Sequence, residues 1–343
     1  MLRPCGVARC MLVALCAAIL APVPAQGIPE GPPPLIPVED FYRNPEMTSV
    51  LVSPDGNYIS YLAPYEGRLN IHVRRIGSDD VWHVTSVTDR DITWYFWGGK
   101  SRIVYLRDGA GDENWRLYAV DPDGGNPRDL TPFDGVKVQP IDSLKEVDDE
   151  MIISMNKRDV SVFDVYRMNI VTGDFQMIAE NPGDVLQWMT DHDGKLRVAV
   201  ASDGADVTIR YRATEDEPFE EMVRTPFTDK LYPQAFTHDN KLLYVATDIG
   251  RDKAALYMYD PEKRELLDLI YEHPEVDVSD IVLSDVQEEL MGIFYYSDRG
   301  HYVFFENDWG QMYRNVKRLL PDRDFLFVSS DLAEEKWTCL LYT

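Results

Sequence analysis

Hydrophobic and polar residues alternate with a period of two along many short stretches of the chain, and polar turns separate these stretches. The stretch VSPDGNYISYL, residues 52–62, is typical, because Ser53-Pro54 and Asp55-Gly56 favour a tight turn and a strand-like run follows. Similar turns precede strand-like runs at 99, 148, 193, 239, 287 and 333. Successive turns lie about 46 residues apart, a period typical of propellers or repeat arrays.

Each repeat follows the same plan, as residues 232–271 illustrate. YPQAFT leads into the turn and KLLYVA leaves it, a polar loop comes before ALYMYD, and a second turn comes before ELLDLIY. Four antiparallel strands in each repeat correspond to one propeller blade. We therefore predict an all-β fold, a seven-bladed β-propeller with four-stranded antiparallel blades. Residues 41–343 would form six full blades and half of a seventh, with few helices because no window shows a persuasive helical period.

The N-terminus has the pattern of a secretory signal peptide over residues 1–25. Arg3 and Arg9 come before the apolar run CMLVALCAAILA, and Val23-Pro24-Ala25 offers small residues for cleavage before Gln26. An uncleaved membrane anchor is the alternative. A Pro-rich leader, residues 26–40, follows. These features predict a periplasmic or secreted protein with no membrane contact after cleavage.

Charge and cysteine content restrict the binding partners and the disulfides that the chain can have. The chain has 59 acidic and 34 basic residues, a net charge of −25, which argues against nucleic-acid partners and anionic membrane surfaces. Three of the four cysteines lie in the predicted signal peptide, so cleavage leaves Cys339 without an internal disulfide partner.

Candidate chemistry is sparse. Residues 121–126 and 191–195 bear a faint likeness to calcium loops, but the pattern is incomplete. His192 lies between two aspartates, which is compatible with a metal site but more typical of an exposed turn. No zinc motif occurs, and nothing selects a carboxylate pair for a glycosidase among the many Asp and Glu residues. We predict no catalytic, cofactor-binding or metal-ligating residue.

Aromatic and charged residues suggest two weaker candidates for a peptide site. Five tryptophans would either line a peptide funnel or fill gaps between blades: Trp94, Trp97, Trp115, Trp188 and Trp309. Asp298 and Arg299 would either contact a substrate terminus or form a capped turn, and the turn is the interpretation that we prefer.

The repeats resemble a known family. VSPDGNYISYL, together with YYSDRG at 295–300 and LYAVDPDGGNPRDLTP at 117–132, is similar to the blades of the prolyl oligopeptidase family of serine peptidases. LYMYDPEKRELLDL at 256–269 and the lead-in at 36–56 are similar to its acylaminoacyl-peptidase and dipeptidyl-peptidase-like bacterial branch. The resemblance implies a propeller that limits substrate access to a following α/β-hydrolase domain carrying Ser, Asp and His.

The chain departs from that family in its chemistry. A nucleophile elbow needs Gly-x-Ser-x-Gly, and no such pentapeptide occurs in the sequence. We therefore expect a non-catalytic, substrate-gating propeller portion of an exported peptidase without its hydrolase domain. Its peptide substrate would be reached only through that missing domain, and the open seventh blade would favour self-association. A stand-alone binding propeller, like that of the Tol translocation system, is the alternative, and an unusual hydrolase built on a propeller alone is a third.

Overall fold

The computed structural model describes residues 35–145 and 147–342. The chain divides into two units, Met1–Arg43 and Asn44–Thr343, and the described part of the first contains the short helix α1 (Val38–Tyr42). The predicted signal peptide, residues 1–25, and the first part of the predicted leader lie outside the described residues. Among the described helices, none combines the length and the apolar character needed to span a bilayer.

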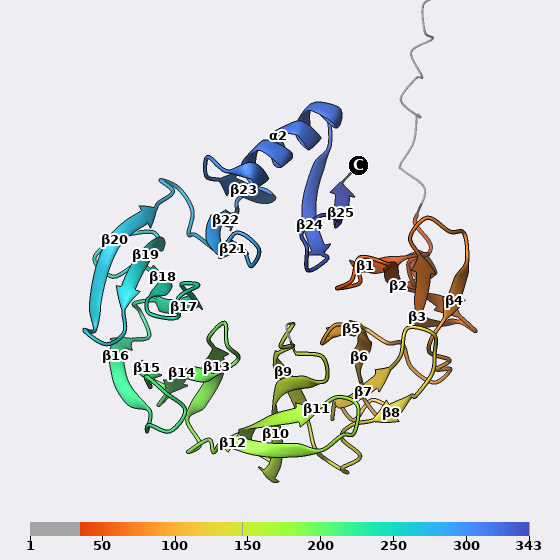
Figure 1. The fold of residues 1–343 in the computed structure, drawn as a ribbon, viewed down its shortest axis with the longest axis horizontal. Helices are drawn as coiled ribbons and strands as arrows, with labels where there is room; N and C mark the ends of the chain where they lie inside the picture. The colour runs from red at the N-terminus through yellow and green to blue at the C-terminus, as the bar shows by residue number, and fades with distance from the viewer. Residues whose placement is uncertain (1–34, 146, 343) are drawn as a thin grey trace, which may run out of the picture. The chain divides into compact units, whose positions relative to one another are not determined.

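The second unit is a ring of antiparallel sheets, shown in Figure 1. Five sheets have four strands each, and chain order equals strand order in every one. Blade 1 contains β1 (Thr48–Val52), β2 (Tyr58–Tyr65), β3 (Arg68–Arg75) and β4 (Val81–His83). Blade 2 contains β5 (Trp94–Gly98), β6 (Arg102–Arg107), β7 (Arg116–Val120) and β8 (Arg128–Asp129). Blade 3 contains β9 (Val138–Asp142), β10 (Glu150–Asp159), β11 (Val162–Asn169) and β12 (Phe175–Ala179).

The remaining blades continue the ring. Blade 4 contains β13 (Val185–Thr190), β14 (Leu196–Ser202), β15 (Asp206–Tyr211) and β16 (Glu220–Pro226). Blade 5 contains β17 (Leu231–Phe236), β18 (Leu243–Thr247), β19 (Ala255–Asp260) and β20 (Glu265–Tyr271). Blade 6 contains β21 (Asp280–Ser284), β22 (Glu289–Tyr296) and β23 (Gly300–Phe304), and helix α2 (Asp308–Leu319) follows it. The strands β24 (Asp324–Ser330) and β25 (Trp337–Tyr342) form a two-stranded sheet, here called the terminal hairpin.

The all-β propeller with four-stranded antiparallel blades is confirmed, but the predicted blade count is wrong. The described residues form six blades and not seven, followed by the terminal hairpin. The prediction of six full blades is also wrong, because the sixth sheet has three strands and α2 stands where its fourth strand was expected.

Helix α2, which was not predicted from the sequence, has a clear physical origin. The Asn307 side chain caps its first turn by accepting a hydrogen bond from the Gly310 N–H at 2.9 Å. Trp309, Tyr313 and Val316 repeat at helical spacing and lie on its inner face, and Trp309 is buried there. Tyr313 packs against Phe325 of the terminal hairpin, with ring centroids 5.0 Å apart, so the helix joins blade 6 to the hairpin.

The turns between the first two strands of each blade carry the repeat that the sequence showed. A side-chain oxygen at the first turn position accepts backbone N–H groups from the residues that follow. Ser53 Oγ accepts from Tyr58 at 2.9 Å, Asp191 Oδ1 from Lys195 at 2.9 Å, and Thr237 Oγ1 from Leu242 at 3.1 Å. The predicted turn positions therefore coincide with real turns.

Apolar side chains from facing sheets form a separate cluster between each pair of adjacent blades up to blade 6. The cluster between blades 2 and 3 includes Leu117, Met151 and Ile153, all with no exposed surface. A similar cluster around Ile71 and Ile103 joins blades 1 and 2. These clusters explain why the second and third strands of each blade read as apolar runs, because both of their faces are covered.

The terminal hairpin packs against blade 1 and completes the ring. The Val52 N–H donates to Ser329 Oγ at 2.9 Å, and the Leu332 N–H donates to the Pro54 carbonyl at 2.9 Å. β24 therefore runs beside β1 in the same direction, and β25 runs in the opposite direction. The start of β1 and the end of β25 consequently lie on one face of the ring, which we call the termini face. The opposite face carries the turns between first and second strands and is called the turn face.

Candidate functional site

The termini face gathers exposed apolar side chains from the strand starts and loops of several blades. The chain direction places these residues there, with exposed fractions of 44% to 81%: Trp94, Val160, Leu186, Phe227, Tyr232, Ile249, Tyr296 and Leu319. On the turn face the comparable residues include Ile76, Val81, Val147, Val171 and Val286, all of them small or medium aliphatic side chains. Large apolar and aromatic side chains that gather on one face are typical of a surface that binds another protein or domain.

Arginine–carboxylate pairs alternate with these apolar residues on the termini face. Arg210 donates to Asp184 at 2.9 Å, and these hydrogen bonds lower the pKa of the Asp184 carboxyl. Arg107 lowers the pKa of Asp89 in the same way. The carboxylates are therefore held ionised, and the face combines apolar side chains with paired charges, as docking surfaces do.

In one such pair the carboxylate is buried and belongs to the scaffold. Arg158 donates to both oxygens of Asp164, at 2.8 and 2.9 Å, and the Asn181 N–H donates to Asp164 at 2.9 Å. Asp164 has no exposed surface, so its charge is compensated entirely by these donors. This network fixes the loop between blades 3 and 4 at the edge of the termini face.

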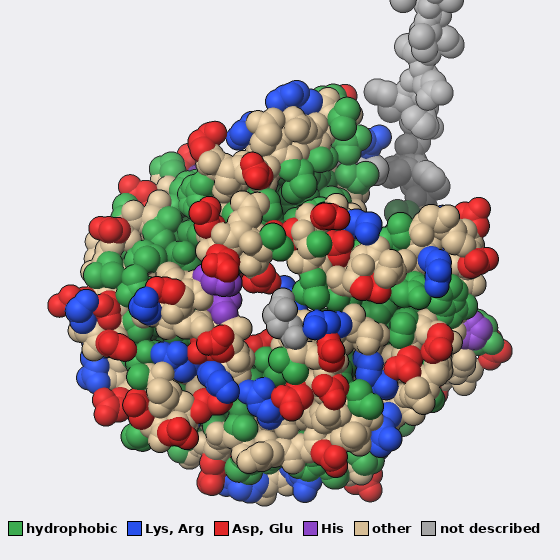
Figure 2. Space-filling model, in the orientation of Figure 1, with side chains coloured by type: hydrophobic (Ala, Val, Ile, Leu, Met, Phe, Trp, Pro, Cys, Tyr) green, Lys and Arg blue, Asp and Glu red, His purple; other side chains and the backbone are tan. Residues whose placement is uncertain are grey.

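A cavity of about 690 Å³ opens on the turn face at the centre of the ring. Its lining includes Asp142, Leu144, His192, His238 and Asp285 from blades 3 to 6. Figure 2 shows histidine side chains on the rim of the central opening, beside acidic and basic groups. The cavity is thus lined by the ends of the innermost strands and by the turns that follow them, and its mouth is polar.

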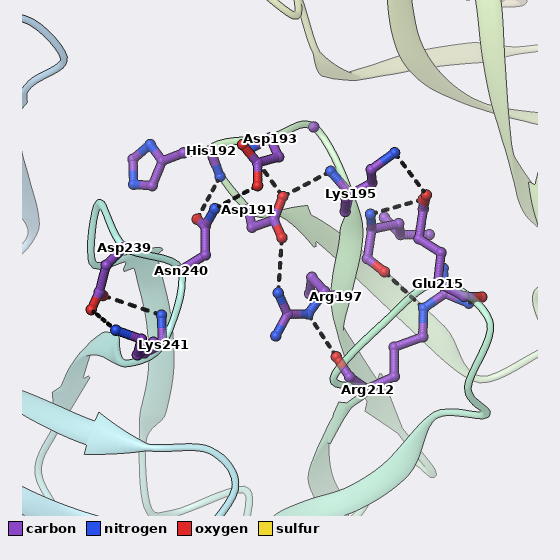
Figure 3. Close-up of polar contacts among 12 residues, drawn as sticks. Asp191, His192, Asp193, Lys195, Arg197, Arg212, Glu215, Asp239, Asn240 and Lys241 are labelled. Carbon is purple, nitrogen blue, oxygen red and sulfur yellow. Dashed lines mark hydrogen bonds and ion pairs between the residues drawn. The ribbon is translucent and has the colours of Figure 1, made fainter.

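The polar network at this mouth is drawn in Figure 3. Asp191 accepts from Arg197 Nη1 at 2.9 Å, and Arg197 Nε donates to the Arg212 carbonyl at 2.8 Å. Arg197 and Asp191 are both buried, so the pair fixes the turn without reaching the cavity as free charge. Burial lowers the pKa of the nearby Arg212 guanidinium, which donates to the carbonyl oxygens of Leu196 and Glu215.

His192, the histidine that the sequence singled out, lies exposed on this turn. Its Nε2 lies 3.0 Å from the Phe236 carbonyl of blade 5, to which it donates, and its ring lies 5.2 Å from that of His238. Its aspartate neighbours do not bond to the ring: Asp191 binds Arg197, and Asp193 accepts from Asn240. In the structure His192 therefore joins two turns.

The two calcium-like loops are ordinary turns in the structure. Asp121 accepts from Arg102 at 2.8 Å and from the Asn126 side chain at 2.6 Å. Its carboxylate is consequently occupied by donors within the same blade. Across residues 35–145 and 147–342, no three His, Cys, Asp or Glu side chains converge as metal ligands would.

The tryptophans divide between the two roles that the sequence left open. Trp97, Trp188 and Trp309 are each 8% exposed and fill gaps between blades or between α2 and the hairpin. Trp94 and Trp115 instead line a shallow pocket of about 240 Å³ beside the termini face. Trp97 and Trp309 also border a pocket of about 260 Å³ near blade 1 and the terminal hairpin, so the two roles overlap in these residues.

Asp298 and Arg299 form a capped turn at the termini face. Asp298 lies 3.2 Å from His301 Nε2 and accepts from Ser297 and Arg299, and these bonds lower the pKa of its carboxyl. Arg299 also pairs with Asp324 of the terminal hairpin. The pair therefore links blade 6 to the hairpin.

Sequence reasoning missed the residues that join neighbouring turns on the turn face. Asn240, Glu288 and Glu334 bond to the preceding blade, and His238 is the partner of Glu288. The sequence did contain a signal for them, because Asn240, Glu288 and Glu334 occupy the turn position at which other repeats have glycine.

The structure is thus a propeller with an apolar termini face and a central cavity on the turn face. No protein-family model matches the sequence. The chain is 32% identical over 265 residues to dipeptidyl aminopeptidase BIII of Pseudoxanthomonas mexicana, covering 73% of this chain and 38% of that protein. It is 25% identical over 282 residues to dipeptidyl peptidase family member 6 of Caenorhabditis elegans, covering 76% and 37%.

A solved structure shares the fold. In a study of two prolyl endopeptidases, the aligned part covers 75% of this chain and 40% of that chain, with a TM-score of 0.58 and 13% identity. The matched region spans less than half the length of each of these relatives. The chain belongs to the prolyl oligopeptidase family and corresponds to its propeller part.

Proposed function

We propose that this propeller limits which peptides reach an α/β-hydrolase domain of the prolyl oligopeptidase type. The observation that carries the proposal is the 32% identity to dipeptidyl aminopeptidase BIII across the propeller. In this proposal the propeller is non-catalytic, and the hydrolysis of peptides belongs to the other domain. The absence of a Gly-x-Ser-x-Gly pentapeptide from the 343 residues supports that division of labour.

The termini face is the proposed docking surface for the hydrolase domain. The first and last strands of the ring both open onto it, so segments joined to them are directed to that face. Phe227 and Leu186 are 77% and 71% exposed there, while the turn face offers no exposed aromatic side chain of comparable size among the described residues. Docking would cover these side chains and leave the central cavity on the turn face open to solvent.

The proposed substrates are unfolded peptides, as the names of the two curated relatives suggest. A central cavity of about 690 Å³ has the size of a small-ligand site and is far smaller than a folded domain. Export is also proposed, on the signal-like pattern of residues 1–25.

A chimera tests the proposal. Residues 44–342 would replace the matched propeller region of dipeptidyl aminopeptidase BIII, and hydrolysis of a chromogenic dipeptide and of a long peptide would be measured. We expect the chimera to cleave the dipeptide and to discriminate against the long peptide, whereas the present chain alone cleaves neither.

Docking is tested by matched surface variants of the chimera. Phe227→Asp on the termini face should abolish turnover of the dipeptide, and Val286→Asp on the turn face, a control whose side chain is also exposed, should leave it intact. Equal effects of both variants would contradict docking on the termini face, and turnover by the present chain alone would contradict a non-catalytic propeller.

A further inference from the structure

The turns on the turn face share a residue in the left-handed backbone region, and its identity changes around the ring. Blades 1 and 4 have Gly56 and Gly194 there, with φ of +67° and +68°. Blades 5 and 6 and the terminal hairpin have Asn240, Glu288 and Glu334, with φ of 58°, 57° and 55°. A glutamate in this region is strained relative to glycine, so its retention calls for a compensating interaction.

Each of the non-glycine residues reaches back to the turn of the preceding blade. Asn240 Oδ1 accepts from the His192 N–H at 2.9 Å, and Asn240 Nδ2 donates to Asp193 at 3.1 Å. The Glu288 carboxylate lies 3.4 Å from His238 Nε2. Blades 4, 5 and 6 are thereby joined through side chains of the residues that bear the strain.

The terminal hairpin repeats the arrangement with the shortest bonds. Glu334 accepts from Ser284 Oγ at 2.6 Å and from the Asp285 N–H at 3.0 Å. Both donors belong to the turn of blade 6. Because a carboxylate is the acceptor, these hydrogen bonds are stronger than bonds between neutral groups.

At the glycine positions, no side chain can extend from this turn residue, because the adjacent blade or hairpin lies too close. A Cβ at Gly56 would lie 2.5 Å from Asp331 Oδ2, and a Cβ at Gly194 would lie 2.4 Å from Leu144 Cδ2. At these turns the neighbouring blade itself fills the space, and a side chain is excluded. On the turn face, some neighbouring turns therefore pack directly against a glycine. Others are joined by a side chain that extends from one turn to the turn before it.

We infer that Asn240, Glu288 and Glu334 are blade-to-blade staples, which hold blades 4, 5 and 6 and the terminal hairpin together as one body on the turn face. The seam between blades 4 and 5, which Asn240 spans, has nine buried apolar residues, whereas the seam that Glu288 spans has few. The cluster between blades 5 and 6 has three buried members, Leu256, Val278 and Ile293, against the twelve between blades 2 and 3. The inference does not depend on the peptidase assignment.

Two substitutions at Glu334 distinguish the contribution of its hydrogen bonds from the cost of its strained backbone. Glu334→Ala removes the hydrogen bonds and keeps the strained backbone, while Glu334→Gly removes both. Glu66 is the matched control, because it has φ of 49°, is exposed, and bonds to no residue that the structure describes. We expect the wild type to have the highest melting temperature, Glu334→Gly a lower one and Glu334→Ala the lowest. The melting temperature of Glu66→Gly should equal or exceed that of the wild type.

Amide hydrogen exchange gives a local readout that general destabilisation would not reproduce. The Asp285 N–H loses its acceptor in both Glu334 variants, and the His192 N–H loses its acceptor in Asn240→Gly. We expect each of these amides to exchange about tenfold faster in its own variant and to be unchanged in Glu66→Gly. Unchanged exchange at Asp285, or a Glu334→Gly protein more stable than wild type, would overturn the inference.

Discussion

Blades 1 to 3 and the stretch from blade 5 to the terminal hairpin are built from the same repeat but are held together differently. The seams between blades 1, 2 and 3 bury large clusters, with twelve members around Met151 and Ile153 and eleven around Ile71. The seam between blades 5 and 6 buries three. There, side chains such as Glu288 and Glu334 bridge the turns instead.

The difference shows that blades with the same backbone repeat can be held together in two ways, by apolar packing or by side-chain hydrogen bonds between turns. Apolar burial contributes about 25 cal/mol for each Å² removed from water and does not depend on direction. A hydrogen bond from a turn is directional, and its net contribution is about 1 kcal/mol. The first half of the ring should therefore resist opening more than the second.

The largest effect is expected from a cavity in the thick seam. Ile153→Ala in β10 should lower the free energy of unfolding by about 4 kcal/mol, because the eleven other buried members of its cluster cannot collapse into the space. Ile293→Ala in β22 is the matched change in the thin seam and should cost about 2 kcal/mol. Urea denaturation compares the two, and an equal or reversed order would break the comparison.

A buried charge in blade 3 should be the next most sensitive position. Asp164→Asn removes the ionic partner of Arg158 from a site with no exposed surface, and we expect a loss of about 3 kcal/mol. Asp298→Asn, at an exposed turn of blade 6, should change the urea midpoint only slightly. A larger loss for Asp298→Asn would show that the exposed pairs near the hairpin carry more of the stability than we infer.

The contact between α2 and the hairpin should give a local effect. Tyr313→Ala removes a ring that packs against Phe325 and Phe327, and we expect a loss of about 2 kcal/mol. Limited proteolysis should then cut the hairpin before any other part of the ring. Cleavage that begins in blades 1 to 3 would contradict this order.

Acid should weaken one contact in the second half by a small amount. The Ala254 N–H donates to Asp277 at 2.8 Å and lowers the pKa of that carboxyl below its usual 3.8. The stability from this bond is present above pH 3.8 and is lost as the pH falls through the lower folded-state pKa. Asp277→Asn should remove this part of the pH dependence, as measured by melting temperature between pH 5 and pH 2, and an unchanged acid profile would argue against it.

The sequence predicted the repeat because turn chemistry is local. Ser53, Asp191 and Thr237 accept hydrogen bonds from residues four or five positions further along the chain. Their pattern can therefore be recognised from the sequence alone. Helix α2 was not predicted, although Trp309, Met312, Tyr313 and Val316 stand at helical spacing, because the repeat as a whole favoured four strands in every blade.

The contacts between blades could not be predicted, because their partners lie one repeat away. Glu334 binds Ser284 and Asn240 binds His192 across about 50 residues of chain, and no local pattern pairs them. For the same reason, the sequence did not distinguish Trp188, which fills a seam, from Trp94, which lies on the termini face.

Native-state amide hydrogen exchange across the whole ring tests the central claim most directly. We predict the slowest exchange in β10 and β11 at the thick seam, faster exchange in β21 and β22, and the fastest in the terminal hairpin. Uniform exchange in all blades, or greatest protection in the hairpin, would contradict the account.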